Sequence, residues 1–276
     1  MTDPRSPTLS SPDEPGQHPV ALAGDALRRR IYSPQSYAQV RNTAVVPIVH
    51  SECETLASWF PVVWRRRQQN VEFVAVRGLL NNEQALPRPA AALLPLILRA
   101  YPFVFDPARP IGPETPRMLD DVFADAPTDA GASITTVKLR LSRGTTTRFA
   151  FMDRFAAEIS PTTKIGCALA GMDAFEPWPL KFNVDGHQLL IPDLFVIRRA
   201  MFDDGSFAPL LQEYGMSCAR MLSLHRLSLF RAGGLLATAK AFLGRRRDAR
   251  PDEDTDSATR PADNRPAPAS LAPAQP

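Results

Sequence analysis

Residues 180–191 read Leu180-Lys181-Phe182-Asn183-Val184-Asp185-Gly186-His187-Gln188-Leu189-Leu190-Ile191, so that two apolar runs flank an Asp-Gly pair. An Asp-Gly pair between apolar runs is the strongest short signal for a β-hairpin, because a type I′ turn needs positive φ at both central residues. Pro192-Asp193 then separates this hairpin from a further apolar run at 194–197, which we expect to be a third strand. The stretch therefore predicts antiparallel β-structure in the late part of the chain.

Other patterns add strands and helices on both sides of this hairpin. The runs at 43–50, from Val62 onward, and at 71–76 are short, apolar and rich in β-branched residues, and we expect strands there. Helical spacing and capping residues predict helices at 51–59, 149–159, 163–172, 206–214 and 216–230. Residues 90–98 fit a helix or a buried strand, and Pro95 weakens both. The predicted fold class is α+β, a single domain with a curved antiparallel sheet and C-terminal helices.

The two ends of the chain differ in composition from the middle. Residues 1–43 are rich in Pro, Ser and Asp, and residues 244–276 are rich in Pro, Ala, Arg and Asp, with few large apolar residues in either. Segments of this composition bury too little apolar surface to offset the entropy of ordering them. We therefore expect disordered N- and C-terminal tails around a folded domain at 44–243.

Charge, cysteines and hydropathy exclude several classes of protein. The net charge of +3 does not require a nucleic-acid partner, and neither a nucleic-acid motif nor a Gly-rich phosphate loop is present. The three cysteines are far apart, so reduced thiols are expected and a disulfide framework is not. The N-terminus lacks a signal-peptide pattern. The sequence contains no run of 18 apolar residues, so no transmembrane segment is predicted. These features predict a soluble cytoplasmic protein without a cofactor.

Histidines provide the main candidates for catalysis and metal binding. His225 and Ser228 lie one turn apart on an expected helix, which would suit a Ser–His nucleophile pair. The alternative is a buried histidine that donates to a backbone carbonyl, with Ser228 bonding back to its own helix, and we favour it. If the protein were instead a metal-assisted enzyme acting on peptides or envelope components, its ligands would be His50, Glu52, His187 and His225.

Two further segments could bind partners. Arg99 and Tyr101 could bind a peptide carboxylate or stack on a ring of a ligand. Alternatively, Arg99 could form an ion pair with a carboxylate of the protein while Tyr101 packs in the core. Residues 235–247 form a basic, partly amphipathic stretch, which would suit weak contact with an anionic membrane surface. The same stretch also fits a last helix that closes the core and ends in solvated arginines, which we prefer.

Four short phrases in a fixed order resemble a known family. They are Val46-Pro47-Ile48-Val49-His50, Phe60-Pro61-Val62-Val63-Trp64, Leu98-Arg99-Ala100-Tyr101-Pro102-Phe103 and Leu224-His225-Arg226-Leu227-Ser228-Leu229. Together they resemble the bacterial SapC family of surface-layer-associated proteins, over about 44–243. The resemblance departs in two places: Gln84 to Pro89 replaces a Gly-Trp feature, and Arg198-Arg199 stands where an acidic residue is usual. A site at either position would be altered or lost.

The resemblance implies a role in surface-layer or cell-envelope biology and carries over no catalytic residue. We therefore expect a non-catalytic protein that binds a peptide or protein of the envelope, or of its export or modification. A groove bordered by the segment around Arg99 and by the late helix is the expected site. Its candidate residues are Arg99, Tyr101, Phe103, His225 and Ser228.

Overall fold

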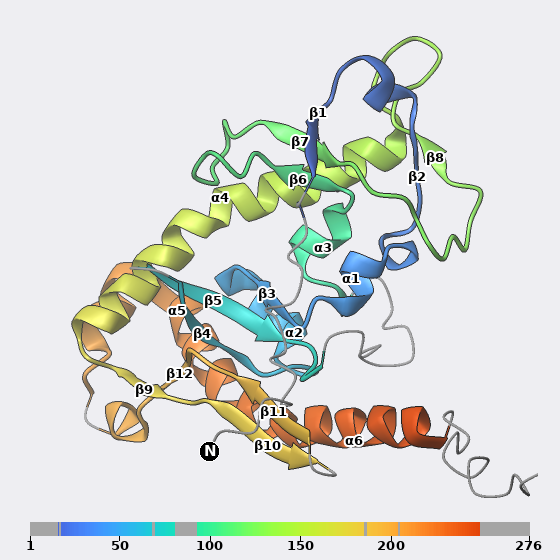
Figure 1. Cartoon of the computed structure of the whole chain (residues 1–276). Helices are drawn as coiled ribbons and strands as arrows, with labels where there is room; N and C mark the ends of the chain where they lie inside the picture. The colour runs from blue at the N-terminus through green and yellow to red at the C-terminus, as the bar shows by residue number, and fades with distance from the viewer. Residues whose placement is uncertain are drawn as a thin grey trace, which may run out of the picture.

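The computed structural model describes residues 16, 18–67, 70–80, 93–184, 187–203 and 205–248. Twelve strands, six α-helices and several short 3-10 helices make up this part of the chain (Figure 1). The strands are β1 (Pro19–Ala21), β2 (Arg30–Ile31), β3 (Val45–Pro47), β4 (Val62–Arg67), β5 (Asn70–Val76), β6 (Phe103–Phe105), β7 (Arg117–Asp120), β8 (Ala132–Ser133), β9 (Phe175–Pro177), β10 (Leu180–Val184), β11 (His187–Ile191) and β12 (Leu194–Ile197). The helices are α1 (Ala38–Asn42), α2 (Cys53–Leu56), α3 (Leu96–Ala100), α4 (Arg143–Gly171), α5 (Ala208–Ser228) and α6 (Ala232–Asp248).

A five-stranded antiparallel sheet in the order β3-β5-β4-β12-β9 forms the centre of the molecule. Strand β12 pairs with β4, so that Phe195 lies opposite Trp64 and the late part of the chain joins the early part. Strands β10 and β11 pair separately with Val184 opposite His187, and only Asp185-Gly186, outside the described residues, connects them. The predicted hairpin and the α+β class are therefore confirmed.

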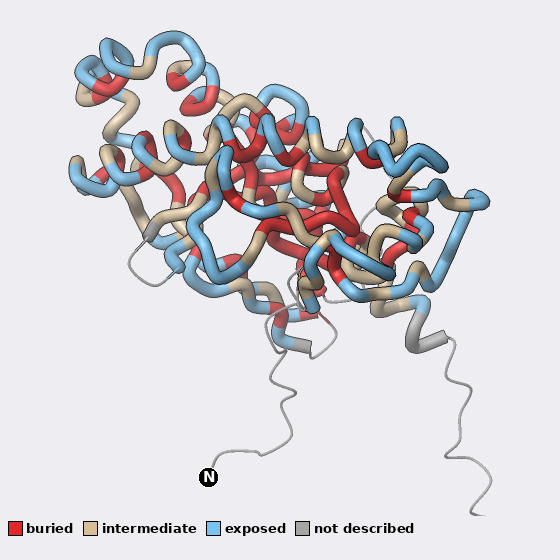
Figure 2. The backbone as a smooth tube through the Cα atoms, turned by 90° about the horizontal axis from the view of Figure 1, so that it is seen from above, coloured by how far each residue is buried: buried red, intermediate tan, exposed pale blue. Residues whose placement is uncertain are grey.

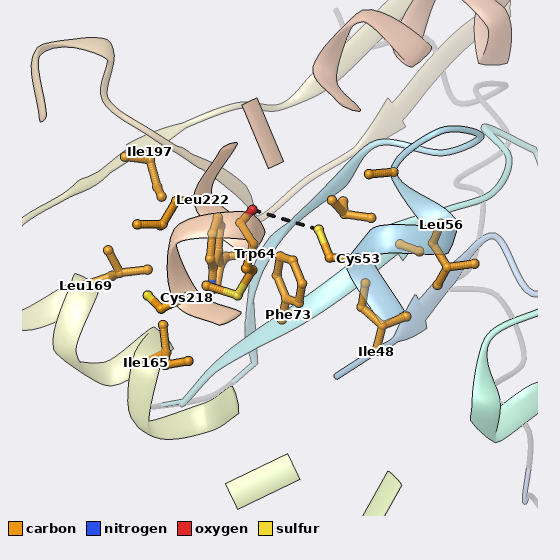
Figure 3. Packing of buried hydrophobic residues seen from close by; sticks show 14 of the residues in the cluster. Ile48, Cys53, Leu56, Trp64, Phe73, Ile165, Leu169, Ile197, Cys218 and Leu222 are labelled. Carbon is orange, nitrogen blue, oxygen red and sulfur yellow. Dashed lines mark hydrogen bonds between the residues drawn. The ribbon is translucent and has the colours of Figure 1, made fainter. Parts of the chain in front are cut away.

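Residues 62–64 of β4 and 73–76 of β5 are buried, and because successive side chains of a strand point to opposite faces, the sheet is covered on both faces there. On one face, Trp64 and Phe73 pack against helices α4 and α5, as Figure 3 shows. On the other face, Val63 and Val74 pack against the β10–β11 hairpin and against Leu235 of α6. The buried residues run through the middle of the molecule in Figure 2, and this sheet is the layer on which the helices rest.

Helix α4 is one continuous helix from Arg143 to Gly171, so the prediction of separate helices at 149–159 and 163–172 is wrong. Pro161 lies inside it, although proline lacks a backbone N–H and disfavours helix interiors. The apolar residues on the two sides of Pro161 enter different core clusters: Met152 and Phe155 pack near β6, and Ile165 and Leu169 pack near Trp64. Burial along the whole length therefore outweighs one missing hydrogen bond.

Residues 18–43 belong to the fold, so the expected boundary of the N-terminal tail at residue 43 lies too far along the chain. Ile31, Tyr37 and Val40 are buried, and the Tyr37 ring packs edge-on against Tyr101 at 5.0 Å between centroids. The low apolar content of this segment concealed the fact that its few large side chains all point inward. Residues 1–15 and 249–276, expected as tails, lie outside the described residues.

The C-terminal helices close the two faces of the sheet. Gly215 has positive φ and interrupts α5, in agreement with the prediction that a helix ends at this residue. Helix α6 then runs through Gly233-Gly234, and Leu235 and Ala239 are buried against the hairpin. Within the described part of the chain, none of the helices is both long and apolar enough to cross a bilayer.

Candidate functional site

His225 and Ser228 tie α5 to the sheet rather than facing a groove. Both are fully buried. The His225 Nδ1 lies 2.7 Å from the Val62 carbonyl oxygen, and Nε2 accepts from the Ile197 amide at 3.3 Å. Because one ring nitrogen faces an acceptor and the other faces a donor, the ring is neutral with its proton on Nδ1. Burial lowers the pKa of His225 from 6.5 to about 4, in agreement with that neutral state.

The Ser228 hydroxyl completes the same tie. It accepts from the Val62 amide at 3.0 Å and donates to the His225 carbonyl oxygen at 2.7 Å. The Ser228 hydroxyl therefore donates its proton to the backbone of its own helix. A nucleophilic serine would instead need to donate it to an imidazole nitrogen. The preferred interpretation, a buried histidine with Ser228 bonding back to its helix, is confirmed.

Tyr101 and Phe103 are also buried completely, in a different part of the core. The Tyr101 hydroxyl donates to Asp120 Oδ2 at 2.6 Å, and Phe103 packs edge-on against Phe149. Burial is the main reason why the pKa of Tyr101 is raised above its usual range. The structure therefore does not bring the Arg99–Phe103 segment and the His225 helix together around a groove, and four of the five expected binding residues are core residues.

Arg99 is the exception, because it lines a cleft of about 670 Å³. The cleft lies between the segments 31–34 and 129–132, the α3 residue Arg99 and the first turns of α4. The Arg99 guanidinium carbon lies 3.9 Å from the centre of the Phe151 ring, a cation–π contact that positions the side chain over the ring. Within the described residues, this guanidinium has no hydrogen bond or ion pair with another side chain.

Positive charge dominates the cleft. Arg99, Arg143 and Arg148 line it, and Asp129 is the one acidic residue among the described residues of the lining. The Asp129 carboxylate is already occupied, because it accepts from the backbone amides of Ser33 at 3.2 Å and Gly131 at 2.8 Å. Burial lowers the pKa values of Arg99 and Arg148 from the usual value, as expected for cations partly withdrawn from water. An anion in the cleft would relieve this cost.

The wall opposite Arg99 is fixed by backbone interactions. The Arg30 guanidinium donates to the carbonyl oxygens of Ala130 at 2.9 Å and Gly131 at 2.7 Å. Gly131 has φ of 66°, and a Cβ there would lie 2.7 Å from the Tyr32 ring, so a side chain is excluded on both counts. Arg148 in turn donates to the Tyr32 carbonyl oxygen. The cleft is therefore held open by a rigid loop, and a ligand would not have to order it.

The sequence did not single out Arg143, Arg148 or the 129–131 loop as a site. A signal was present, because residues 132–152 contain four basic residues and no acidic one. That signal gives a charged segment but not a cleft, since part of the lining, residues 31–34, comes from more than a hundred positions before Arg143.

The candidate metal ligands do not converge. The His50 Nδ1 lies 2.9 Å from the Thr162 hydroxyl oxygen, while Glu52 accepts from the backbone amides of Val49 at 3.0 Å and Leu96 at 2.6 Å. His225 is held by the sheet, and the side chain of His187 lies outside the described residues. Within the described residues, no three His, Cys, Asp or Glu side chains are grouped as a metal site requires.

The other sequence candidates are accounted for by surface contacts or packing. Arg198, where the resemblance departs, forms an ion pair with Asp173 at 2.6 Å on the surface, and the departure at 84–89 lies outside the described residues. The apolar residues of the basic stretch 235–247 pack on the hairpin, as the preferred interpretation of a closing helix predicts.

Comparison with known proteins addresses the family directly. The search of curated proteins and the search of solved structures each return no match. The SapC family model, by contrast, matches residues 28–229, which include most of the described fold and all four phrases that carry the resemblance. The chain therefore belongs to the SapC family.

Proposed function

We propose that this protein is a non-catalytic binding protein that takes an acidic segment of a peptide or protein into the cleft beside Arg99. The observation that carries the proposal is the Arg99 guanidinium, stacked on Phe151 and without a side-chain hydrogen-bond partner among the described residues, in a cleft with a net positive charge. Glu52 acts on the Arg99 cation only through space, without a hydrogen bond or a paired contact. A partly buried cation without a paired anion is a costly arrangement, and ligand binding is a reason to keep it.

A carboxylate suits this cleft better than an uncharged group does. A guanidinium presents a rigid fork of donors that matches the two oxygens of a carboxylate, and such bidentate pairs are among the stronger hydrogen bonds in proteins. The contact with Phe151 positions the Arg99 guanidinium before a ligand arrives. Arg143 and Arg148 lie on the neighbouring turns of α4, so one acidic segment could meet more than one cation.

Family membership supports the choice of partner class. The SapC family name points to surface-layer or envelope biology, and we propose that the acidic segment belongs to an envelope protein or to one exported or modified on its way there. The protein would meet this partner in the cytoplasm. His225 and Ser228, the residues most suggestive of catalysis, serve the fold, which is consistent with a binding role.

Arg99→Ala tests the proposal in a direct binding measurement. With a fluorescein-labelled, glutamate-rich peptide as the probe, we expect saturable binding to the wild-type protein and a loss of about tenfold or more in affinity for Arg99→Ala. Arg99→Lys should fall between the two, because lysine keeps the charge but not the fork. Fluorescence polarisation at physiological ionic strength measures all three.

A matched control separates a site from general charge attraction. Arg245→Ala removes one positive charge from exposed α6, away from the cleft lining, and should bind the peptide as the wild type does. The same peptide with glutamine in place of glutamate should not bind. Equal affinity of the wild type and Arg99→Ala for the acidic peptide would disprove the proposal, as would equal binding of both peptides.

A further inference from the structure

A closed hairpin loop between β8 and α4 projects from the molecule. The Ser142 amide donates to the Ile134 carbonyl oxygen at 2.9 Å, which joins the two ends of the loop. Thr135 and Leu141 form an isolated antiparallel bridge, and the Thr136 amide donates to the Arg140 carbonyl oxygen at 2.7 Å. Figure 1 shows the loop extending beyond the start of α4. The loop is therefore ordered by its own backbone bonds and by its anchored ends.

The tip of this loop exposes large apolar side chains. Val137 is fully exposed, Leu139 is 83% exposed and Leu141 is 44% exposed. Leu139 also has positive φ, at 56°, a region that non-glycine residues rarely adopt. The Leu139 amide donates to the Thr136 carbonyl oxygen at 2.9 Å, so the turn itself holds this residue outward. Exposed apolar side chains on a fixed projection differ from the scattered ones of an ordinary surface.

Basic residues alternate with the apolar ones. The sequence of the tip is Val137-Lys138-Leu139-Arg140-Leu141, and Arg143 follows after Ser142. Lys138, Arg140 and Arg143 are all exposed, and residues 132–152 contain no acidic residue that could neutralise them within the segment. The surface on which this tip would rest must therefore accept apolar side chains and carry negative charge.

We propose that the loop 135–141 docks on the surface of an anionic lipid bilayer, with Val137 and Leu139 entering the interface and Lys138 and Arg140 among the headgroups. Lipid bilayers take up a few apolar side chains flanked by lysine and arginine, whose long stems keep the charge at headgroup level. A stable protein–protein interface buries roughly 800 Å² on each partner, much more than two side chains at a narrow tip can offer. The shape and the charge together therefore favour a membrane.

This proposal goes beyond the acidic-segment cleft and stands on different residues. The two features are neighbours, because Arg143 ends the loop and also lines the cleft. Docking of the tip would hold the cleft close to the membrane surface, where an envelope protein on its way to export would pass. Either proposal could nevertheless fail without the other, since one concerns Arg99 and the other concerns Val137 and Leu139.

Vesicle binding by the full chain provides the test. We expect the wild-type protein to co-sediment with phosphatidylcholine vesicles that contain about 30 mol% phosphatidylserine, and to bind pure phosphatidylcholine far more weakly. The double variant Val137→Ser/Leu139→Ser should lose about tenfold or more in affinity, and Lys138→Gln/Arg140→Gln should lose a similar amount. Binding should weaken as salt rises, because counterions screen the lysine and arginine charges.

A matched control and a direct readout of insertion sharpen the test. Phe230 is 84% exposed on the 3-10 helix at Leu229–Arg231, so Phe230→Ser removes a comparable apolar side chain elsewhere and should bind vesicles normally. Leu139→Trp places a fluorescent probe at the tip. After the wild-type fluorescence is subtracted, the emission of this added tryptophan should shift to the blue when vesicles bind, and brominated lipids should quench it. Val137→Ser/Leu139→Ser should still bind the acidic peptide, which separates this test from that of the cleft.

Four results would overturn the proposal. The first is that the wild-type protein does not bind anionic vesicles. The second is that Phe230→Ser loses as much binding as the tip variant. The third is that the tryptophan signal stays that of exposed indole. Self-association that only the tip variant abolishes would make the loop an interface between two copies of the chain, and this too would overturn it.

Discussion

His225→Leu is expected to lower the free energy of unfolding by roughly 3–5 kcal/mol, even though leucine is close in volume and apolar. The imidazole connects α5 to two strands through the Val62 carbonyl oxygen and the Ile197 amide. Leucine would leave both backbone groups buried without a partner, and each such group costs about 1–3 kcal/mol. The ring also packs edge-on against Trp64 at 4.7 Å between centroids, a contact that leucine replaces only in part.

Urea unfolding followed by tryptophan fluorescence measures this loss, because Trp64 lies in the same core. Ser228→Ala provides the graded comparison: it removes the acceptor of the Val62 amide and should cost about 1–2 kcal/mol. The double variant should cost less than the sum, because both side chains hold the same residue of β4. A loss below about 1 kcal/mol for His225→Leu would show that the tie is not structural and would return His225 to the list of functional candidates.

The elements that the sequence predicts correctly are those with local causes. Asp185-Gly186 requires a hairpin whatever surrounds it, and Gly215 ends a helical segment because it adopts a positive φ. The β-branched runs form β3, β4 and β5, and this too has a local cause, because the β-branched residues that favour a strand lie within each run. Even the interpretation of His225 and Ser228 is partly local: Ser228 bonds to a carbonyl oxygen three residues earlier in its own helix.

Features that depend on distant partners could not be predicted. Pro161 predicts a helix end, and only the presence of core on both sides of it keeps α4 continuous. Tyr37 lies in a segment of disorder-like composition, yet its ring meets Tyr101 across the fold. The conformation of a segment is decided by what it packs against whenever its own preference is weak.

The cleft illustrates the same limit for function. The resemblance drew attention to Arg99, which lines a cleft other than the expected groove beside the His225 helix. Tyr101 and Phe103, its neighbours in the phrase, lie in the core. Within this phrase, the two aromatic residues are buried and Arg99 lines the cleft. The opposite wall comes from 31–34 and 129–132, and the tertiary fold, not the local sequence, brings these segments close to Arg99.

Relative to the wild-type protein, Glu52→Gln is expected to gain about 3 kcal/mol in free energy of unfolding as the pH rises from about 4 to 8. Burial raises the pKa of Glu52 from 4.5 to about 7, although the amides of Val49 and Leu96 act in the opposite direction. A carboxyl group whose pKa is raised on folding contributes stability below its unfolded pKa, and this contribution is lost as the pH rises through its folded pKa. Glutamine is uncharged at every pH and so avoids this loss. Its NH2 group cannot accept from the second of the two backbone amides, a cost that does not change with pH.

His225 acts in the opposite sense, which makes the pH profile of the wild-type protein informative. Its pKa falls from 6.5 to about 4 on folding, so its contribution is complete above pH 6.5 and is lost as the pH falls through 4. Between about pH 4.5 and 6.5 the two effects nearly cancel, and the wild-type stability should be almost flat there. Glu52→Gln removes one of them, so its stability should fall on acidification by about 3 kcal/mol.

Urea unfolding of both proteins at several pH values between about 4 and 8 separates these contributions. The difference between the two stability curves should change in favour of Glu52→Gln between about pH 4.5 and 7 and stay constant above that. If the difference were instead the same at all pH values, folding would not raise the pKa of Glu52. Its hydrogen bonds to two backbone amides would then outweigh the cost of its burial, and Glu52 would stabilise the start of α3 as a charged cap.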